Sequence, residues 1–108
     1  MFSPDAMFYK DHVKSNSEKI HKATLHKSKN ILLGLNCLVP GQVQTIHAHE
    51  GQDKFYYVIE GEGVFIIGDE KKTYGTGHIV WASAGAVHGV SNQGNEDLIL
   101  LVGITPSP

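Results

Sequence analysis

Short apolar segments alternate with turn-forming residues along most of this chain. Segments 54–59 and 79–82 are rich in aromatic and β-branched residues, which is typical of strands. Segment 31–39 is apolar at nearly every position, a pattern that indicates a strand buried on both faces. The expected strands are 20–25, 31–39, 43–49, 54–59, 64–67, 79–82, 87–91 and 98–104. Roughly eight to ten strands at this spacing, with no convincing helical segment, predict an all-β sandwich or barrel.

The chain has 108 residues, which is the length of one domain. We expect residues 19–104 to form the barrel and residues 1–18 to form a polar N-terminal arm. The arm carries four large side chains that could pack on the barrel or on a partner subunit: Phe2, Met7, Phe8 and Tyr9. Strands at the open edges of a sheet must be paired or covered, which favours a closed barrel or a homodimer.

The composition excludes several classes of function. An apolar fraction of 41% and a net charge of -2 describe a soluble globular chain rather than a disordered segment or a nucleic-acid binder. No apolar run approaches the roughly 20 residues of a membrane span, and no signal peptide is recognisable. The single cysteine, Cys37, cannot form an internal disulfide. It is expected to be a buried apolar residue, which fits a reducing, cytoplasmic location.

Histidine is the residue with the clearest chemical signal. The chain has seven histidines, and its nine strongly basic residues are all lysines. In an extended strand, His47 and His49 would share one face with Val43 and Thr45, and His88 could join them from a later strand. Three neutral imidazoles suit zinc, iron, nickel or copper, so they indicate a metal site without selecting the metal. Without arginine, a substrate anion must be held by lysine, histidine, backbone or metal.

Two sets of residues resemble the two motifs of the cupin superfamily. The first motif, G-x5-H-x-H-x3,4-E-x6-G, is matched by Gly41, His47, His49 and Gly61. The second motif, G-x5-P-x-G-x2-H-x3-N, is matched by Gly77, Gly85, His88 and Asn92, with Ser83 in place of proline. The resemblance implies a small double-stranded β-helix, or jelly-roll cupin barrel, that forms a homodimer. It also implies one divalent transition metal (Fe, Ni, Mn, Zn or Cu) held by His47, His49 and His88.

Lys54 stands where the cupin motif has its glutamate, the usual fourth ligand. A cation about 4 Å from a divalent metal is repelled by several kcal/mol even with strong screening. Lys54 could avoid this repulsion at the barrel mouth with its ammonium in water, or by pairing with Glu50, Asp53 or Glu62. It could also lie in the pocket as a neutral amine that acts as a base or binds substrate. A weak or absent metal site is a further alternative.

Strand alternation gives the neighbours of Lys54 different expected roles. Tyr56 shares its face and would either bind substrate or pack, so we name Lys54 and Tyr56 as candidate catalytic residues. Asp53 faces the opposite way and becomes a ligand only if a turn breaks the alternation. Trp81 is expected in the core or in a dimer interface. The remaining histidines are expected in a turn, for His78, and at the surface, for His12, His21 and His26.

These features favour a metalloenzyme that acts on a small organic molecule. The three-histidine pattern without glutamate is similar to that of thiol dioxygenases and diketone-cleaving enzymes, so dioxygenase-like oxidation is favoured and isomerisation is another cupin activity. The absence of arginine disfavours the thiol dioxygenases. The first alternative is a non-catalytic barrel that binds a metal or a small molecule at a site that Lys54 alters or leaves metal-free. The second is a structural dimer whose site has decayed.

Overall fold

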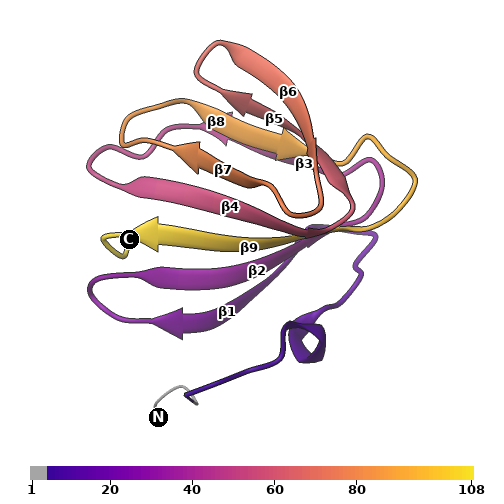
Figure 1. Cartoon of the computed structure of the whole chain (residues 1–108), viewed down its shortest axis with the longest axis horizontal. Coiled ribbons are helices and arrows are strands. Elements are labelled where there is room, and N and C mark those ends of the chain that lie inside the picture. The colour runs from indigo at the N-terminus through magenta and orange to yellow at the C-terminus, as the bar shows by residue number, and fades with distance from the viewer. Residues whose placement is uncertain (1–4) are drawn as a thin grey trace.

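Residues 5–108 are described by a computed structural model, and they form two antiparallel β-sheets (Figure 1). The five-stranded sheet has the order β1-β2-β9-β4-β7, and the four-stranded sheet has the order β3-β8-β5-β6. The strands are β1 (His21–Lys27), β2 (Leu32–Leu38), β3 (Val43–His47), β4 (Asp53–Glu60), β5 (Glu62–Ile67), β6 (Glu70–Gly75), β7 (Ile79–Ala82), β8 (His88–Ser91) and β9 (Leu98–Thr105). Within this range the one helical element is a 3-10 turn, η1 (Tyr9–His12). The predicted all-β fold, a double-stranded β-helix, is confirmed.

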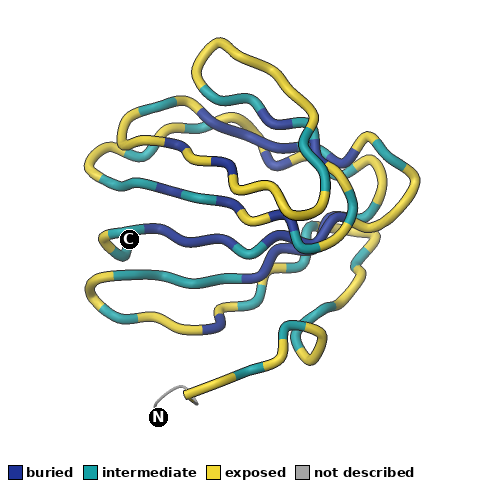
Figure 2. The backbone as a smooth tube through the Cα atoms, in the orientation of Figure 1, coloured by how far each residue is buried: buried dark blue, intermediate teal, exposed yellow. Residues whose placement is uncertain are grey.

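The main core lies between the two sheets. Strand β4 shows how the sequence produces it, because its side chains alternate between the core and the outer face. Tyr56 and Val58 are fully buried, and Tyr56 packs edge-on against Phe65 of the opposite sheet with ring centroids 5.2 Å apart. Figure 2 shows buried positions on strands of both sheets, and those of the main core form one apolar cluster. The same alternation carries Lys54 into this interior, where it is 4% exposed.

A second apolar cluster lies on the outer face of the five-stranded sheet. Leu35 and Cys37 of β2 are buried there, and Met7 and Tyr9 of the N-terminal segment pack against them. Because the other face of β2 lines the main core, both faces of the strand are covered, which explains why 31–39 is apolar at almost every position. The predicted burial of Cys37 is confirmed. Met7 and Tyr9 thus pack on the barrel, which is one of the two alternatives expected for the arm. Of the other arm residues, Phe8 is exposed and Phe2 lies outside the described residues.

Two expectations about individual faces are wrong. The strand predicted over 43–49 ends at His47, and Val43 is 60% exposed while Gln44 is buried. Val43 therefore does not share the inner face with the histidines. For Trp81 the core alternative is wrong, since the side chain is 51% exposed and stacks on the outward-facing Phe55 with ring centroids 6.2 Å apart, and the alternative of a dimer interface stays a prediction.

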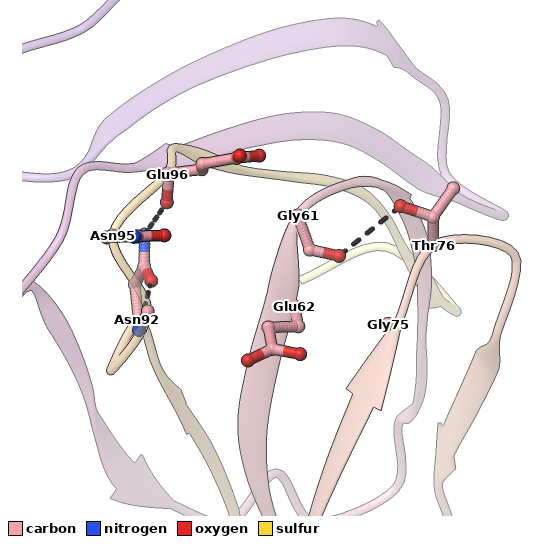
Figure 3. A pocket seen from close by; sticks show the side chains of 8 residues that line it. Gly61, Glu62, Gly75, Thr76, Asn92, Asn95 and Glu96 are labelled. Atoms are coloured by element: carbon pink, nitrogen blue, oxygen red, sulfur yellow. Dashed lines mark hydrogen bonds between the residues drawn. The ribbon is translucent and has the colours of Figure 1, made fainter.

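At the end of the barrel where β8 finishes, the Asn92 side chain connects neighbouring segments through hydrogen bonds. Its side-chain amide donates to the carbonyl oxygens of Leu38 and Glu96 at 2.8 Å each, and its oxygen accepts from Gly94 N at 3.0 Å. A polar cavity of about 400 Å³ lies beside this loop, and its lining comes from Gly61, Glu62, Gly75, Thr76, Asn92, Gly94, Asn95 and Glu96 (Figure 3). None of its lining residues is a histidine. Because His88 begins β8 and Asn92 follows its end, the histidine site lies at the opposite end.

Candidate metal centre

His47, His49 and His88 meet at one end of the barrel. His47 ends β3, His49 lies in the loop that follows, and His88 begins β8, where it pairs with His47 across the sheet. The His47 ring centroid is 4.7 Å from that of His49 and 4.5 Å from that of His88. One ring nitrogen from each residue lies within 4.8 Å of the other two. The sequence prediction that these three imidazoles converge is therefore confirmed by geometry.

The route by which they converge differs from the prediction. A uniform strand would place His47 with Val43 and Thr45, which are both exposed. Instead, the β3–β8 register shifts between Gln44 and His47, and this irregularity turns the His47 imidazole inward. His49 reaches the cluster from a loop rather than from the same strand.

The donor set fits a divalent transition metal. Nδ1 of His47 is 2.8 Å from the carbonyl oxygen of Thr45, and Nδ1 of His88 is 3.0 Å from that of Ala86. Because a carbonyl only accepts, each Nδ1 carries the proton and each Nε2 keeps a lone pair for a metal. Nε2 of His88 is buried and has no hydrogen-bond partner in the described part of the chain. The motif could not identify these two backbone acceptors, because they depend on loop conformation.

The electrostatics of the site favour uncharged imidazoles. Burial, followed by the charges of His47 and Lys54, lowers the pKa of His49. Burial also lowers the pKa of His88, although the hydrogen bond to Ala86 opposes this effect, and Lys54 is the next cause of the lowering. Both side chains are thus neutral near pH 7, the form that binds metals.

Lys54 lies in the pocket and not at the barrel mouth. Its Nζ is 4.9 Å from the centroid of the Tyr56 ring, and no carboxylate of residues 5–108 lies within 4.0 Å of it. The expected ion pair with Glu50, Asp53 or Glu62 is therefore wrong, while Nζ is absent from the fully buried, unpartnered polar atoms of the described residues. Burial, with a smaller effect from Lys22, lowers the pKa of Lys54 to about 8.

Asp53 and Tyr56, the residues near Lys54 on β4, each make a hydrogen bond within the barrel. Asp53 faces away from the cluster as strand alternation predicts, and its Oδ1 accepts a hydrogen bond from Ala84 N at 2.8 Å. The Tyr56 hydroxyl donates to Oε1 of Gln44 at 3.0 Å, and burial raises the pKa of Tyr56. A substrate would have to compete with Gln44 for that hydroxyl.

The structure also identifies polar residues that no motif indicated. Asn36 and Gln44 are buried and border, with Lys54, an interior cavity of about 160 Å³. Only the strand register brings them together, so sequence spacing gave no signal for this group.

The other four histidines stay apart from the cluster. His78 is exposed in the turn after β6, with Nδ1 2.9 Å from the carbonyl oxygen of Gly75, as expected. His26 is exposed, while His12 and His21 are half-buried.

Sheet order and histidine geometry together define a small double-stranded β-helix with a histidine cluster at one end. Residues 34–104 match the family described as "Cupin domain" (Cupin_2), and the chain belongs to this cupin family. No helix in the described range is long and apolar enough to cross a membrane.

Three known proteins show what the chain is similar to. The crystal structure of TT1209 from Thermus thermophilus has a TM-score of 0.93 and 39% identity, covering 97% of this chain and 100% of that one. The oxalate-binding protein of Thermotoga maritima is 31% identical over 82 residues, which are 76% of this chain and 67% of that protein. A Thermotoga maritima structure described as a predicted oxalate decarboxylase has a TM-score of 0.77 and 31% identity, covering 80% and 79% of the two chains.

Proposed function

We propose that this cupin binds one divalent transition metal through His47, His49 and His88, and that the metal binds a small organic acid in the barrel. The observation that carries the proposal is the convergence of three imidazole nitrogens within 4.8 Å, with the buried Nε2 of His88 unpartnered among residues 5–108. Three protein ligands leave coordination positions for a ligand, as in other open metal sites. When bound, the metal would supply positive charge that attracts and polarises the oxygen atoms of this ligand.

Oxalate is the first ligand to test. One relative is named for binding oxalate, and another is described as a predicted oxalate decarboxylase. The chain itself supports an anionic ligand, because Lys54 is buried without a carboxylate partner in the described range. We propose that Lys54 contacts the ligand. Tyr56 would lie near the ligand, but the Tyr56 hydroxyl would keep its hydrogen bond to Gln44.

Elemental analysis of protein purified without added metal or chelator tests the metal site. Near-stoichiometric Fe, Ni, Mn, Zn or Cu in the wild type, absent from a His47→Ala/His88→Ala double variant, is the expected result. Calorimetric titration with oxalate should then give binding to the metal-loaded wild type and none to the double variant. Equal metal contents in the two proteins would refute the proposal.

Oxidation of the bound molecule is a second candidate function. The observation that favours it is the all-imidazole cluster, in which no carboxylate of the described residues takes part. Oxygen consumption by iron-loaded protein in the presence of a small-molecule panel tests this reaction. Tight oxalate binding without turnover of any compound would favour the non-catalytic binding protein instead.

We also propose that the chain works as a homodimer in the cytoplasm. Exposed apolar side chains on β7 support the dimer, since Ile79 is 70% exposed and Trp81 is 51% exposed beside the unpaired edge of the sheet. The reduced state expected for Cys37 supports the location.

A further inference from the structure

A small cavity beside Lys54 is lined by polar groups that can donate hydrogen bonds and by no acid. It measures about 160 Å³, and its polar lining residues are Lys22, Thr24, Asn36, Gln44 and Lys54. None of the three clustered histidines lines it, so the cavity is separate from the candidate metal centre. Two lysines without an acid give this region a positive potential, which attracts anions.

Three nearly buried side chains of this cavity carry donors that lack an acceptor in the described part of the chain. Lys54 is 4% exposed, and its Nζ contacts only the face of the Tyr56 ring at 4.9 Å, without a hydrogen bond or an ion pair. Asn36 is 6% exposed, and its side-chain amide makes no hydrogen bond within residues 5–108. Gln44 is 8% exposed and uses its Oε1 for the Tyr56 hydroxyl, so its Nε2 keeps both hydrogens for another acceptor. Buried donors of this kind are costly until a negatively charged oxygen joins them.

Lys54 also has the properties that allow an amine to react with carbon dioxide. Burial, with a smaller effect from Lys22, lowers the pKa of Lys54 to about 8, so much of the amine is uncharged in mildly alkaline solution. Carbon dioxide adds three heavy atoms, half the number in the benzene that a cavity of about 150 Å³ accepts. A surface groove of about 520 Å³ between the start of β1 and β3 shares Lys22 and Gln44 with the cavity and provides a route inward.

We infer that Lys54 is a reversible carboxylation site, at which carbon dioxide forms a carbamate with Nζ. The lone pair of the neutral amine attacks the carbon of carbon dioxide, a C–N bond forms, and one electron pair of a C=O bond moves to oxygen. One N–H proton leaves to water, and nothing is oxidised or reduced. The carbamate oxygens accept hydrogen bonds from the amides of Asn36 and Gln44, and Lys22 adds positive charge at the exposed side of the cavity.

This modification goes beyond the proposed function and does not require the metal. It replaces a buried cation with an anion at the position where the cupin motif has its glutamate. Carbon dioxide and the anionic ligand of the proposed function would use the same Nζ of Lys54. Each should therefore exclude the other.

Carbon-13 NMR of the full chain in labelled bicarbonate at about pH 8.5, with lysine labelled by nitrogen-15, tests the modification. We expect a carbamate carbon resonance that is split by its bond to nitrogen-15, both in the zinc-loaded protein and after metal removal. The resonance should disappear in Lys54→Met, which keeps the apolar stem but has no amine. Lys72→Met is the matched control, because Lys72 pairs with Glu70 at the surface and its loss changes the net charge equally.

Three results would overturn the inference. The first is the absence of a carbamate resonance from the wild type, and the second is an equal resonance in Lys54→Met. The third is a bound carbon signal without coupling to nitrogen-15, which would mean that bicarbonate binds without a covalent bond.

A second variant tests whether the carbamate lies in this cavity. Asn36→Leu keeps the approximate shape of the side chain and removes its amide. We expect the carbon dioxide concentration for half-modification to rise about 10- to 100-fold, as for the loss of a hydrogen bond to a charged group. Lys22→Met should raise it by a smaller factor, because Lys22 is exposed. An unchanged concentration in a folded Asn36→Leu protein would overturn the inference.

Oxalate separates this inference from the proposed function. Added to the zinc-loaded wild type, it should reduce the carbamate resonance, because the proposed ligand and carbon dioxide compete for Lys54. A resonance that oxalate leaves unchanged would refute the contact between Lys54 and the ligand while supporting the carboxylation. A wild type that binds no metal would refute the proposed metal site, and the metal-free sample would still test the carbamate.

Discussion

At the scale of single residues, Lys54 is where burial and charge conflict most directly. The strand pattern places it among Tyr56 and Val58 in the interior, while its ammonium finds no acid in the described chain. The lowered pKa of about 8 is the physical result of this conflict. The proposed contact between Lys54 and an anionic ligand rests on this buried charge.

Replacing Lys54 with glutamate should tighten metal binding. The change removes a cation that lies near the imidazoles and supplies an oxygen ligand at the position where the cupin motif has one. We expect metal affinity to rise roughly 10- to 100-fold, which is the range for changes around metal ligands. Competition with a chromophoric chelator measures the affinity, and Lys54→Gln separates the loss of charge from the gain of a ligand. Unchanged or weaker affinity in Lys54→Glu would show that this side chain does not face the cluster.

Lys54 should also make stability depend on pH in the alkaline range. Its pKa is about 8 in the folded chain and 10.5 as the reference for the unfolded chain. Between these values the unfolded state binds more protons, so this group's contribution to the free energy of unfolding rises with pH. The cost of burying the ammonium is fully present below about pH 8 and is relieved toward pH 10.5.

Urea unfolding at pH 7 and at pH 9.5 measures this effect in the metal-free protein. Each unit of pKa difference corresponds to about 1.4 kcal/mol. The stability gain of Lys54→Met over the wild type should therefore be larger at pH 7 than at pH 9.5. A difference that is independent of pH would mean that Lys54 titrates normally.

At the scale of elements, the start of β4 holds the turn that presents His88. Oδ1 of Asp53 accepts from Ala84 N, and Gly85 N donates to the carbonyl oxygen of His49 at 2.9 Å. Two hydrogen bonds thus hold the 83–86 turn. The one from Gly85 connects the turn to His49 of the cluster.

Two substitutions distinguish this structural role of Asp53 from a role as a metal ligand. Asp53→Asn keeps an oxygen acceptor for Ala84 N and should retain both stability and metal binding. Asp53→Ala removes the acceptor and should cost about 1 kcal/mol of unfolding free energy, with weaker metal binding because the turn before His88 loosens. Denaturant unfolding and the same chelator competition give both values. A ligand role would instead require both variants to lose metal to a similar degree.

Comparison of these elements shows how far the sequence could predict the site. Alternation in β4 depends on local chain geometry, so the inward position of Tyr56 could be predicted, whereas the histidine cluster was implied by the resemblance of the two motifs to those of cupins. The register shift before His47 could not, because a local irregularity leaves no pattern in five residues of strand. The burial of Lys54 could not be predicted from the sequence for a related reason. The depth of the cavity beside Lys54 depends on strands that are distant in sequence.

At the scale of the whole molecule, the outer face of the five-stranded sheet is covered unevenly. The N-terminal segment packs over the part formed by β1, β2 and β9, where Leu35 and Cys37 are buried. Toward the β7 edge, Ile79 and Trp81 remain exposed, and Tyr57 of β4 is 38% exposed. An apolar surface on an edge strand is typical of a contact with another protein surface. A second copy fits because it would cover the same uncovered side chains on both chains.

If this surface forms the proposed homodimer, a charge at the β7 edge should separate its two chains. In a two-fold dimer, Ile79→Lys places one ammonium on each chain at the contact. The cost of burying the charge therefore occurs twice. We expect the dimer dissociation constant to rise by roughly 100-fold or more, as for a central interface residue. Analytical ultracentrifugation over a range of protein concentrations measures it, with Thr73→Lys on the exposed β6 strand as a control of equal charge. A monomeric wild type would refute the homodimer, whereas a dimer that is equally stable in Ile79→Lys would place the contact on another face.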